Sequence, residues 1–524
     1  MQIHNNKALP ILLAAACWLG TTHAQTPSAP QEEASFSVTG FSVQGDNPLP
    51  EALTQSTLAP YVGTHNGIER LQDAAGALEA VLRTRGFGFY RVVLPPQDIG
   101  GVIKLQMYKF ALGTVEVKGN LVFSNDNILR SLPQLGGSNS PNTHELARDL
   151  SVANENPSKR AKVTFRQGTV ADTIDATVDV VDSKTFTGFI AANNTGDSAT
   201  GYGRVTAGVS HTNLFDLDHQ ATLTYTTSPS DPGRVHQFGG YYKAPVYAWG
   251  GVVTAYYTNS SVASGVVGGV FDVTGRGEFA GLQYTHYFAP EGDFRSFASV
   301  TLDDKNFLND KIVPVGGGTP LTPNYRTRPI TLSYTGRMDQ KWGLWGYNVD
   351  YARNLPWGGG NDNASYAANQ AGASTNWSAI RFGADLTTPL PAEWLFIARM
   401  RGQLSGQPLV PGERFGVGGA QSIRGLNERA LAGDTGLQAN FEFWTPALAE
   451  NTRALLFYDF GRIYRHNDAL LDAATVGSLG VGVRWNLGTS LSANLDYGHV
   501  IAGLGKLPVG TSRDKVHFSM NWRY

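Results

Sequence analysis

Arg424 lies in a stretch that is rich in glycines and small polar residues. The sequence GGAQSIRGLNERALAGDTG, residues 418–436, contains Arg424. Glycine lets a backbone pass close to another surface, and an arginine in a confined place usually forms a two-pronged ion pair with a carboxylate. Arg424 could therefore anchor this stretch through an ion pair, which requires an acidic partner elsewhere in the chain.

Two carboxylates in the segments that follow are candidates for this partner. Alternation in RALLFYDFGRIY separates two sets of side chains, with Leu456, Tyr458 and Phe460 on one face and Phe457, Asp459 and Gly461 on the other. If the apolar set faces lipid, Asp459 points to the interior of a barrel. Glu442 also points inward by parity and is the competing partner, and an Arg424 that stays in solvent on a mobile loop is the remaining alternative.

The composition narrows the class of protein. The chain has 524 residues with 61 glycines, 11% aromatic residues and only 16% charged residues, well below the roughly 25% of a typical soluble protein. A net charge of -2 argues against a general nucleic-acid binder. Neither H-E-x-x-H nor G-x-S-x-G occurs, and His211, His219 and His236 lack metal-ligand spacing. We therefore expect no enzyme, no cofactor and no metal site.

The elements that would position the arginine are strands, which dominate residues 184–524. Segments of about ten residues alternate between apolar and polar side chains and are separated by short turns or long loops. In SLGVGVRWNL the apolar set is Leu479, Val481, Val483, Trp485 and Leu487. A water-soluble β-sandwich would also alternate, but aromatic strand ends and a polar inner face favour a transmembrane antiparallel β-barrel of about sixteen strands. The loop at residues 407–436 would fold into it.

Residues before the barrel indicate export and two small domains. Lys7, the apolar run ALPILLAAACWLG and the small residues before Gln25 predict a signal peptide over residues 1–24, cleaved near Ala24. The only cysteine, Cys17, lies inside it, and a lipoprotein box is the minor alternative. A short linker, 25–34, then leads to two units of β-α-α-β-β order, over residues 35–110 and 111–183.

With these motifs the chain resembles the outer-membrane transporters of two-partner secretion, a branch of the Omp85 superfamily that includes the haemolysin and filamentous haemagglutinin transporters. That family has two periplasmic POTRA domains, a sixteen-stranded barrel and a V-R-G-Y/F loop motif that meets an F-x-D-x-G wall motif. The matching residues are Ile423, Arg424, Gly425 and Leu426 in the loop and Phe457, Asp459 and Gly461 in the wall. The stretches ANENPSKRAKVTFRQG and HTNLFDLDHQATLTYTTSP are further matches.

Two departures from the family pattern qualify this resemblance. Leu426 stands at the aromatic position of the loop motif, so the loop tip is expected to pack differently. Residues 25–34 are too short for the N-terminal plug helix and linker that many members have. The resting pore would then be blocked by the loop alone, or would leak.

The resemblance implies a transporter in the bacterial outer membrane with its POTRA domains in the periplasm. Its partners would be a secreted β-helical exoprotein, the membrane lipids and the barrel-assembly machinery, and the transporter would be a monomer that uses no ATP. An extended client segment would pair with an open edge of a POTRA sheet. The candidate edge residues are Tyr90, Val92, Leu94, Val163 and Phe165. A diffusion channel and a barrel-assembly factor are the alternative functions.

Overall fold

The computed structural model describes residues 35–137, 139–198, 200–262, 265–267, 271–273, 275–309, 322–466, 472–507 and 510–524. The predicted signal peptide and linker lie outside these residues. The chain divides into two compact units, Met1–Val81 with Arg91–Tyr108, and Leu82–Tyr90 with Lys109–Tyr524. Among the described helices, none has the length and apolar character needed to cross a membrane.

The first unit is built on a four-stranded sheet with the strand order β2-β1-β4-β3. Its elements are β1 Ser35–Gln44, α1 Glu51–Leu58, β2 Gly63–Asn66, α2 Glu69–Thr84, β3 Tyr90–Val93 and β4 Gly101–Lys109. Helix α2 buries one apolar face, formed by Leu71, Ala74, Ala75, Leu78 and Leu82. The predicted element order was incomplete, because the four residues of β2 pair with β1 and carry no apolar alternation that would announce a strand.

The second domain has the predicted β-α-α-β-β order. Its elements are β5 Ala111–Lys118, α3 Asn125–Arg130, α4 Thr143–Ala153, β6 Lys159–Gln167 and β7 Thr173–Asp182, and the sheet order is β5-β7-β6. Side chains at the helix caps fix the ends of the helices: Ser124 accepts a hydrogen bond from the Asn127 amide, and Asn142 accepts from two amides at the start of α4. In the sheet order β5-β7-β6, strand β6 is an edge strand and pairs only with β7 among the described strands.

One buried carboxyl in α4 makes the stability of this domain depend on pH. Burial raises the pKa of Asp149 to about 6, against the opposing effect of Arg148. Because the pKa is higher in the folded state, its stabilising contribution is present at low pH and is lost as the pH rises through about 6. We expect Asp149→Asn to stabilise the domain at neutral pH by up to about 3 kcal/mol and to flatten the pH dependence. Hydrogen exchange of the α4 amides between acidic and neutral pH measures this effect, and an unchanged pH profile would contradict it.

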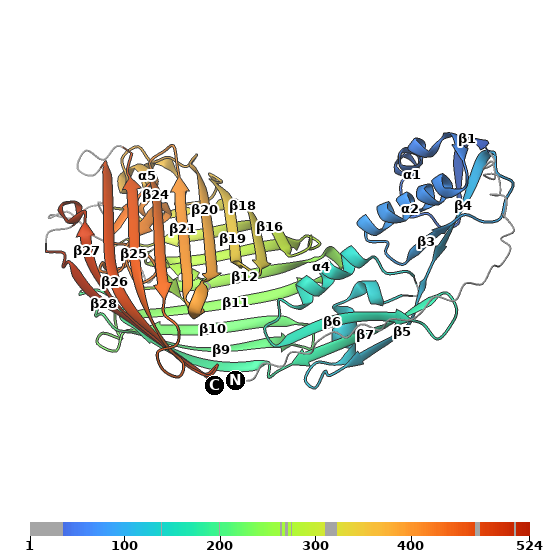
Figure 1. The fold of residues 1–524 in the computed structure, drawn as a ribbon. Coiled ribbons are helices and arrows are strands. Elements are labelled where there is room, and N and C mark those ends of the chain that lie inside the picture. The colour runs from blue at the N-terminus through green and yellow to red at the C-terminus, as the bar shows by residue number, and fades with distance from the viewer. Residues whose placement is uncertain are drawn as a thin grey trace, which may run out of the picture. The chain divides into compact units, whose positions relative to one another are not determined.

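The barrel sheet is closed over the described residues (Figure 1). Strands β17 and β18 follow one another along β16, and when they are counted as one the barrel contains sixteen strands, as predicted. The strands are β8 Phe186–Asn193, β9 Arg204–Leu214, β10 His219–Thr227, β11 His236–Val246, β12 Gly251–Ser260, β15 Gly277–Tyr287, β16 Phe294–Phe307, β17 Tyr325–Thr327, β18 Pro329–Gln340, β19 Gly343–Asn354, β20 Ser378–Pro389, β21 Leu395–Leu404, β24 Thr435–Trp444, β25 Thr452–Tyr464, β26 Ala473–Leu487, β27 Leu491–Ala502 and β28 Asp514–Arg523.

Pairing of the last strand with the first closes the cylinder, with Trp522 opposite Ile190. The predicted alternation holds in β26, where Leu479, Val481 and Val483 are exposed on the outer face while Ser478 is buried on the inner face. Between β12 and β15 lies a small hairpin of β13 Gly265–Val267 and β14 Phe271–Val273, and helix α5 Asn363–Asn369 lies between β19 and β20. Because polar side chains of the strands face the barrel interior, a polar loop can bind to the inner face of the wall.

Candidate functional site: a loop anchored inside the barrel

The connection between β21 and β24 packs against the inner face of the barrel wall. It contains a short hairpin, β22 Phe415–Val417 with β23 Leu431–Gly433. Its apolar side chains form one buried cluster with side chains of β25, β26 and β27; the cluster contains Val417, Ile423, Leu426, Leu431, Ile463, Ala474, Val476 and Val500. Burial of this many apolar groups attaches the loop to the barrel wall, and this contribution does not depend on any charged side chain.

Arg424 contacts both carboxylates that the sequence offered as partners. Its Nε and Nη2 atoms donate to Asp459 Oδ2 and Oδ1 at 2.9 and 2.7 Å, and its Nη1 atom donates to Glu442 Oε1 at 2.7 Å. Its backbone amide also donates to Asp459 Oδ2 at 3.0 Å. The guanidinium lies over the ring of Phe457, 3.5 Å from the ring centroid. Arg424 is only 2% exposed, so this fork is shielded from water and is much stronger than a surface ion pair.

A third carboxylate, not predicted from the sequence, completes the charge balance. Asp496 on β27 lies 3.7 Å from Arg424 and forms a two-pronged pair with Arg484, at 2.8 and 3.0 Å. Arg399 approaches Glu442 to 3.5 Å. Three arginines therefore face three carboxylates, and no net charge is buried. The alternation of LSANLDYGHV is a signal that could have placed Asp496 on the inner face, but nothing in the sequence links it to Arg424, 72 residues earlier.

Glycines on both surfaces allow the two backbones to touch. A Cβ atom added at Gly498 on β27 would lie 2.5 Å from the Arg424 carbonyl carbon and 2.6 Å from the Gly425 nitrogen. Gly425 has φ +102°, a conformation that favours glycine, and its amide donates to His517 Nε2 at 3.1 Å. Gly461 leaves space for the side chain of Ile423, which would come within 3.1 Å of an added Cβ atom. The loop motif and the wall motif therefore fit by shape as well as by charge.

Leu426, at the position where the family carries an aromatic residue, is buried in the same apolar cluster. An aliphatic side chain thus fills this part of the cluster. Phe457 in turn packs over Gly480, where an added Cβ atom would lie 2.3 Å from its ring. The ring is held between the wall glycine and the guanidinium of Arg424.

A second ionic anchor, not predicted from the sequence, holds residues 409–417 of the loop. Glu413 is 2% exposed and accepts from Thr327 Oγ1 at 2.7 Å and from Arg381 Nη2 at 2.8 Å, while Lys305 Nζ lies at 3.2 Å. Beside it, Leu409 and Val410 pack with Tyr366 of α5 and with Trp377 in a buried cluster. The only sequence signal was an acidic residue inside the apolar run LVPGERFGV.

Neutralising this second anchor tests its contribution. We expect Glu413→Gln to loosen residues 409–417 by about 2 kcal/mol or more, because Arg381 then loses its carboxylate and Lys305 keeps only Asp303, at 3.9 Å. Hydrogen exchange of these residues in the detergent-solubilised chain measures the effect. Glu450→Gln, at an exposed position, serves as the matched control. Equal exchange in the two variants would show that the apolar contacts alone hold these residues.

The candidate edge residues of the two small domains are placed differently from one another. Val163 and Phe165 lie in β6, an edge strand of nine residues. Tyr90 and Val92 lie in β3, which is also an edge strand but has only four residues. Leu94 lies outside β3, which corrects the predicted strand bounds; prolines at positions 95 and 96 end the ladder there.

Comparisons with known proteins agree with this architecture. The haemolysin secretion/activation protein ShlB/FhaC/HecB family matches residues 173–485, and the ShlB-type POTRA domain matches residues 36–109. The heme/hemopexin transporter protein HuxB of Haemophilus influenzae is 21% identical over 457 residues, which cover 84% of this chain and 78% of the relative. The outer membrane transporter CdiB of Dickeya dadantii is 21% identical over 446 residues, covering 82% and 77%. The solved structure of CdiB from Escherichia coli superposes with a TM-score of 0.75 at 17% identity, covering 96% of this chain and 93% of that one.

Proposed function

The chain belongs to the haemolysin secretion/activation protein family ShlB/FhaC/HecB, whose members are outer-membrane transporters of two-partner secretion. We propose that it captures an unfolded exoprotein with its POTRA domains and passes it through the barrel without ATP. The observation that carries the proposal is the inward loop held by Arg424 between Asp459 and Glu442. Such a loop occupies space that a polypeptide in transit requires, so it must be both held and releasable.

The anchors suit a gate because they are non-covalent and charge-balanced. When Arg424 leaves, Arg399 stays beside Glu442 and Arg484 stays beside Asp496, while Asp459 keeps the Asn440 amide as a donor at 2.8 Å, so the wall retains two of its three cations. The sequence contains no phosphate-binding loop of the G-x-x-x-x-G-K-[ST] type, so the driving force would come from binding of the client and from its folding outside the cell. Arg424 and its partners would then act in gating and in holding the loop in register, with no catalytic role.

Reconstitution of the purified chain in lipid vesicles tests this proposal. A candidate exoprotein, kept unfolded in urea and then diluted, is offered to the vesicles without any nucleotide. We expect it to become protected from protease in vesicles that contain the chain and to remain digestible in empty vesicles. Protection that requires added ATP would contradict ATP independence. Ion conduction without protection of the exoprotein would favour a diffusion channel, and insertion of other barrels would favour an assembly factor.

A further inference from the structure

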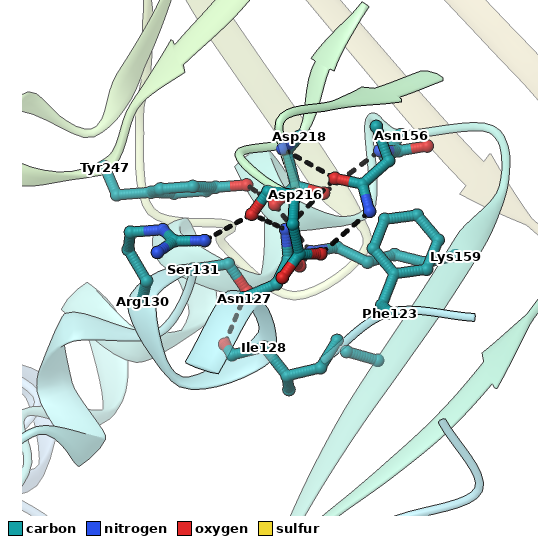
Figure 2. A network of polar contacts seen from close by, with 12 residues as sticks. Phe123, Asn127, Ile128, Arg130, Ser131, Asn156, Lys159, Asp216, Asp218 and Tyr247 are labelled. Atoms are coloured by element: carbon teal, nitrogen blue, oxygen red, sulfur yellow. Dashed lines mark hydrogen bonds and ion pairs between the residues drawn. The ribbon is translucent and has the colours of Figure 1, made fainter. Parts of the chain in front are cut away.

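Polar contacts join the second domain to the barrel turn between β9 and β10 (Figure 2). Lys159, the first residue of β6, donates from Nζ to Asp218 Oδ2 at 2.7 Å and to Asn127 Oδ1 at 2.8 Å. Asn127, in α3, also donates to the Asp216 carbonyl oxygen at 2.9 Å, and Ser124 donates to the Asp216 carboxylate. Because the side chains of Lys159 and Asp218 are buried, this network holds the segment before α3 beside the barrel turn.

A second set of contacts holds the same segment beside the start of the barrel. The Asp182 carboxylate, at the end of β7, accepts from the backbone amides of residues 121, 122 and 123, at 2.9, 2.7 and 3.0 Å from its Oδ2 atom. Strand β8 begins four residues after Asp182, at Phe186, which pairs with His211 of β9. His211 comes four residues before Phe215 of the turn. Residues 121–124 therefore lie between the first barrel strand and the β9–β10 turn.

This arrangement brings exposed apolar side chains together. Leu121 is 91% exposed, Phe215 78%, Phe186 58% and Val122 46%. We call these four residues the junction patch. Single exposed apolar side chains are common on protein surfaces, whereas several from separate segments at one place are typical of a surface that binds a partner or a membrane.

The backbone of the turn keeps one ring of the junction patch exposed. Phe215 has φ 59° and Asp216 has φ 55°, in the left-handed region that is a true outlier for a bulky side chain. Such a conformation persists only where its surroundings hold it. The contacts that Ser124 and Asn127 make with Asp216 hold it here. A phenyl ring fixed in this way at a strained and exposed position indicates surroundings other than water.

The barrel identifies these surroundings. Phe186 and Ile190 are alternate, exposed residues of β8, so Phe186 lies on the outer face of the barrel. Strand β8 begins beside the second domain and β9 returns to the same end, so Phe215 lies at that end too. Four more strand connections at this end carry an exposed aromatic side chain, at Trp249, Phe288, Trp342 and Trp394. Aromatic girdles of this kind mark the level of the lipid headgroups.

We propose that the junction patch is a membrane-binding surface, on which Leu121 and Val122 of the second domain insert beside Phe186 and Phe215 into the headgroup region of the leaflet at this end of the barrel. The occupant is phospholipid, because the patch continues the lipid-facing surface of the barrel and Phe186 belongs to both. The second domain is then attached to the membrane as well as to the barrel. This binding does not rest on transport of a client.

Fluorescence quenching in lipid vesicles tests this surface. Leu121→Cys introduces a unique thiol, because the only cysteine, Cys17, lies in the predicted signal peptide, and it removes little packing, because Leu121 is exposed. The mature chain is labelled with a polarity-sensitive dye and reconstituted in vesicles of phosphatidylethanolamine and phosphatidylglycerol, with or without spin-labelled acyl chains. We expect the spin label to reduce the emission at Leu121→Cys about threefold, because interfacial side chains lie at the boundary of the acyl region.

Two further positions serve as controls for this result. Leu223→Cys, at an exposed position of the barrel strand β10, reports full contact with lipid. Val170→Cys is the matched control, since Val170 is an exposed apolar residue of the same domain but lies between β6 and β7, at the end of the sheet away from Asp182. We expect the emission at Val170→Cys to be that of a dye in water and to be unaffected by the spin label.

Each remaining outcome would overturn the proposal. One is quenching at Leu223→Cys without quenching at Leu121→Cys, and another is equal quenching at Leu121→Cys and Val170→Cys, which would indicate adsorption of the dye. A shift of the Leu121→Cys emission to shorter wavelength without quenching, increasing with the ratio of protein to lipid, would show that a second copy of the chain covers the patch instead.

Charged substitutions test whether lipid contact holds the second domain. Leu121→Glu/Val122→Glu places two carboxylates where the surroundings exclude charge, so residues 121–124 should withdraw from the membrane. In vesicles, we expect hydrogen exchange of the α3 amides to rise about tenfold in this variant and to stay unchanged in Val170→Glu, because α3 follows the inserted residues directly. Equal exchange in the two folded variants would overturn the attachment of the domain to the membrane.

Discussion

Replacing Arg424 by alanine is expected to release the loop from the barrel wall, because truncating one partner of a buried ion pair costs about 3–5 kcal/mol. We expect client secretion to fall about a hundredfold, because the detached loop is no longer held in register for transport. The change leaves Asp459, Glu442 and Asp496 close together without the guanidinium that lies among them. The cation that stacks on Phe457 is lost as well. Arg424→Lys is expected to recover only part of the effect, since a single ammonium group cannot bridge two carboxylates as a guanidinium does.

The position of the loop can be read from a cysteine placed beneath it. Val500 on β27 is 1% exposed and lies under the loop in the apolar cluster, and the sequence has no cysteine besides Cys17 in the predicted signal peptide. We expect Val500→Cys to resist a water-soluble thiol reagent in the otherwise unchanged chain and to react when combined with Arg424→Ala. Arg401→Ala, which removes a half-exposed arginine of the inner face, is the matched control and should stay protected. Protection in both backgrounds would show that the loop remains seated without Arg424.

The second large effect is expected from a single methyl group. Gly498→Ala places a Cβ atom 2.5 Å from the Arg424 carbonyl carbon, a contact that the backbone of the loop must relieve by moving away. Overpacking of this kind costs about 1–3 kcal/mol, so we expect about a tenfold fall in secretion and partial labelling of Val500→Cys. All charges of the anchor remain in this variant, which separates the fit of the two backbones from the ionic contacts.

A glycine on the neighbouring strand supplies the control for this substitution. A Cβ atom added at Gly477 on β26 would meet its nearest neighbours at 3.7 Å, which is ordinary van der Waals contact. Gly477→Ala should therefore secrete normally and keep Val500→Cys protected. If both alanine variants behave alike, the close approach of Gly498 and Arg424 does not determine where the loop sits.

The part of the site that could be predicted from the sequence is the part that depends on the local alternation of apolar and polar residues along each strand. The period of two in RALLFYDFGRIY placed Asp459 on the inner face, and the same parity placed Glu442 there. The glycines around Arg424 indicated a close approach, and the structure provides it at Gly425. The number of strands followed from the regular spacing of alternating segments and turns.

What escaped prediction depends on pairings between segments that are distant in the chain. Asp496 and Gly498 lie more than seventy residues after Arg424, and only the stagger of β25, β26 and β27 brings them to the loop. Glu413 meets Lys305 and Arg381 across the barrel interior, a contact that no spacing in the sequence encodes. Lys159 and Asp218 lay in the two stretches that carried the family resemblance, yet their meeting required the orientation of one domain on the barrel.

The most direct measurement of the central claim is the amount of a co-expressed candidate exoprotein in the culture medium, compared among cells with the intact chain, Arg424→Ala, Arg401→Ala and no transporter. The levels of folded barrel in the outer membrane must be equal in the three transporter strains. If the chain is a secretion transporter gated by this loop, the exoprotein reaches the medium with the intact chain and with Arg401→Ala, and not with Arg424→Ala. Secretion that is equal with Arg424→Ala would contradict the gate, and absence of secretion from the intact chain, with ion conduction in a bilayer, would contradict the transporter.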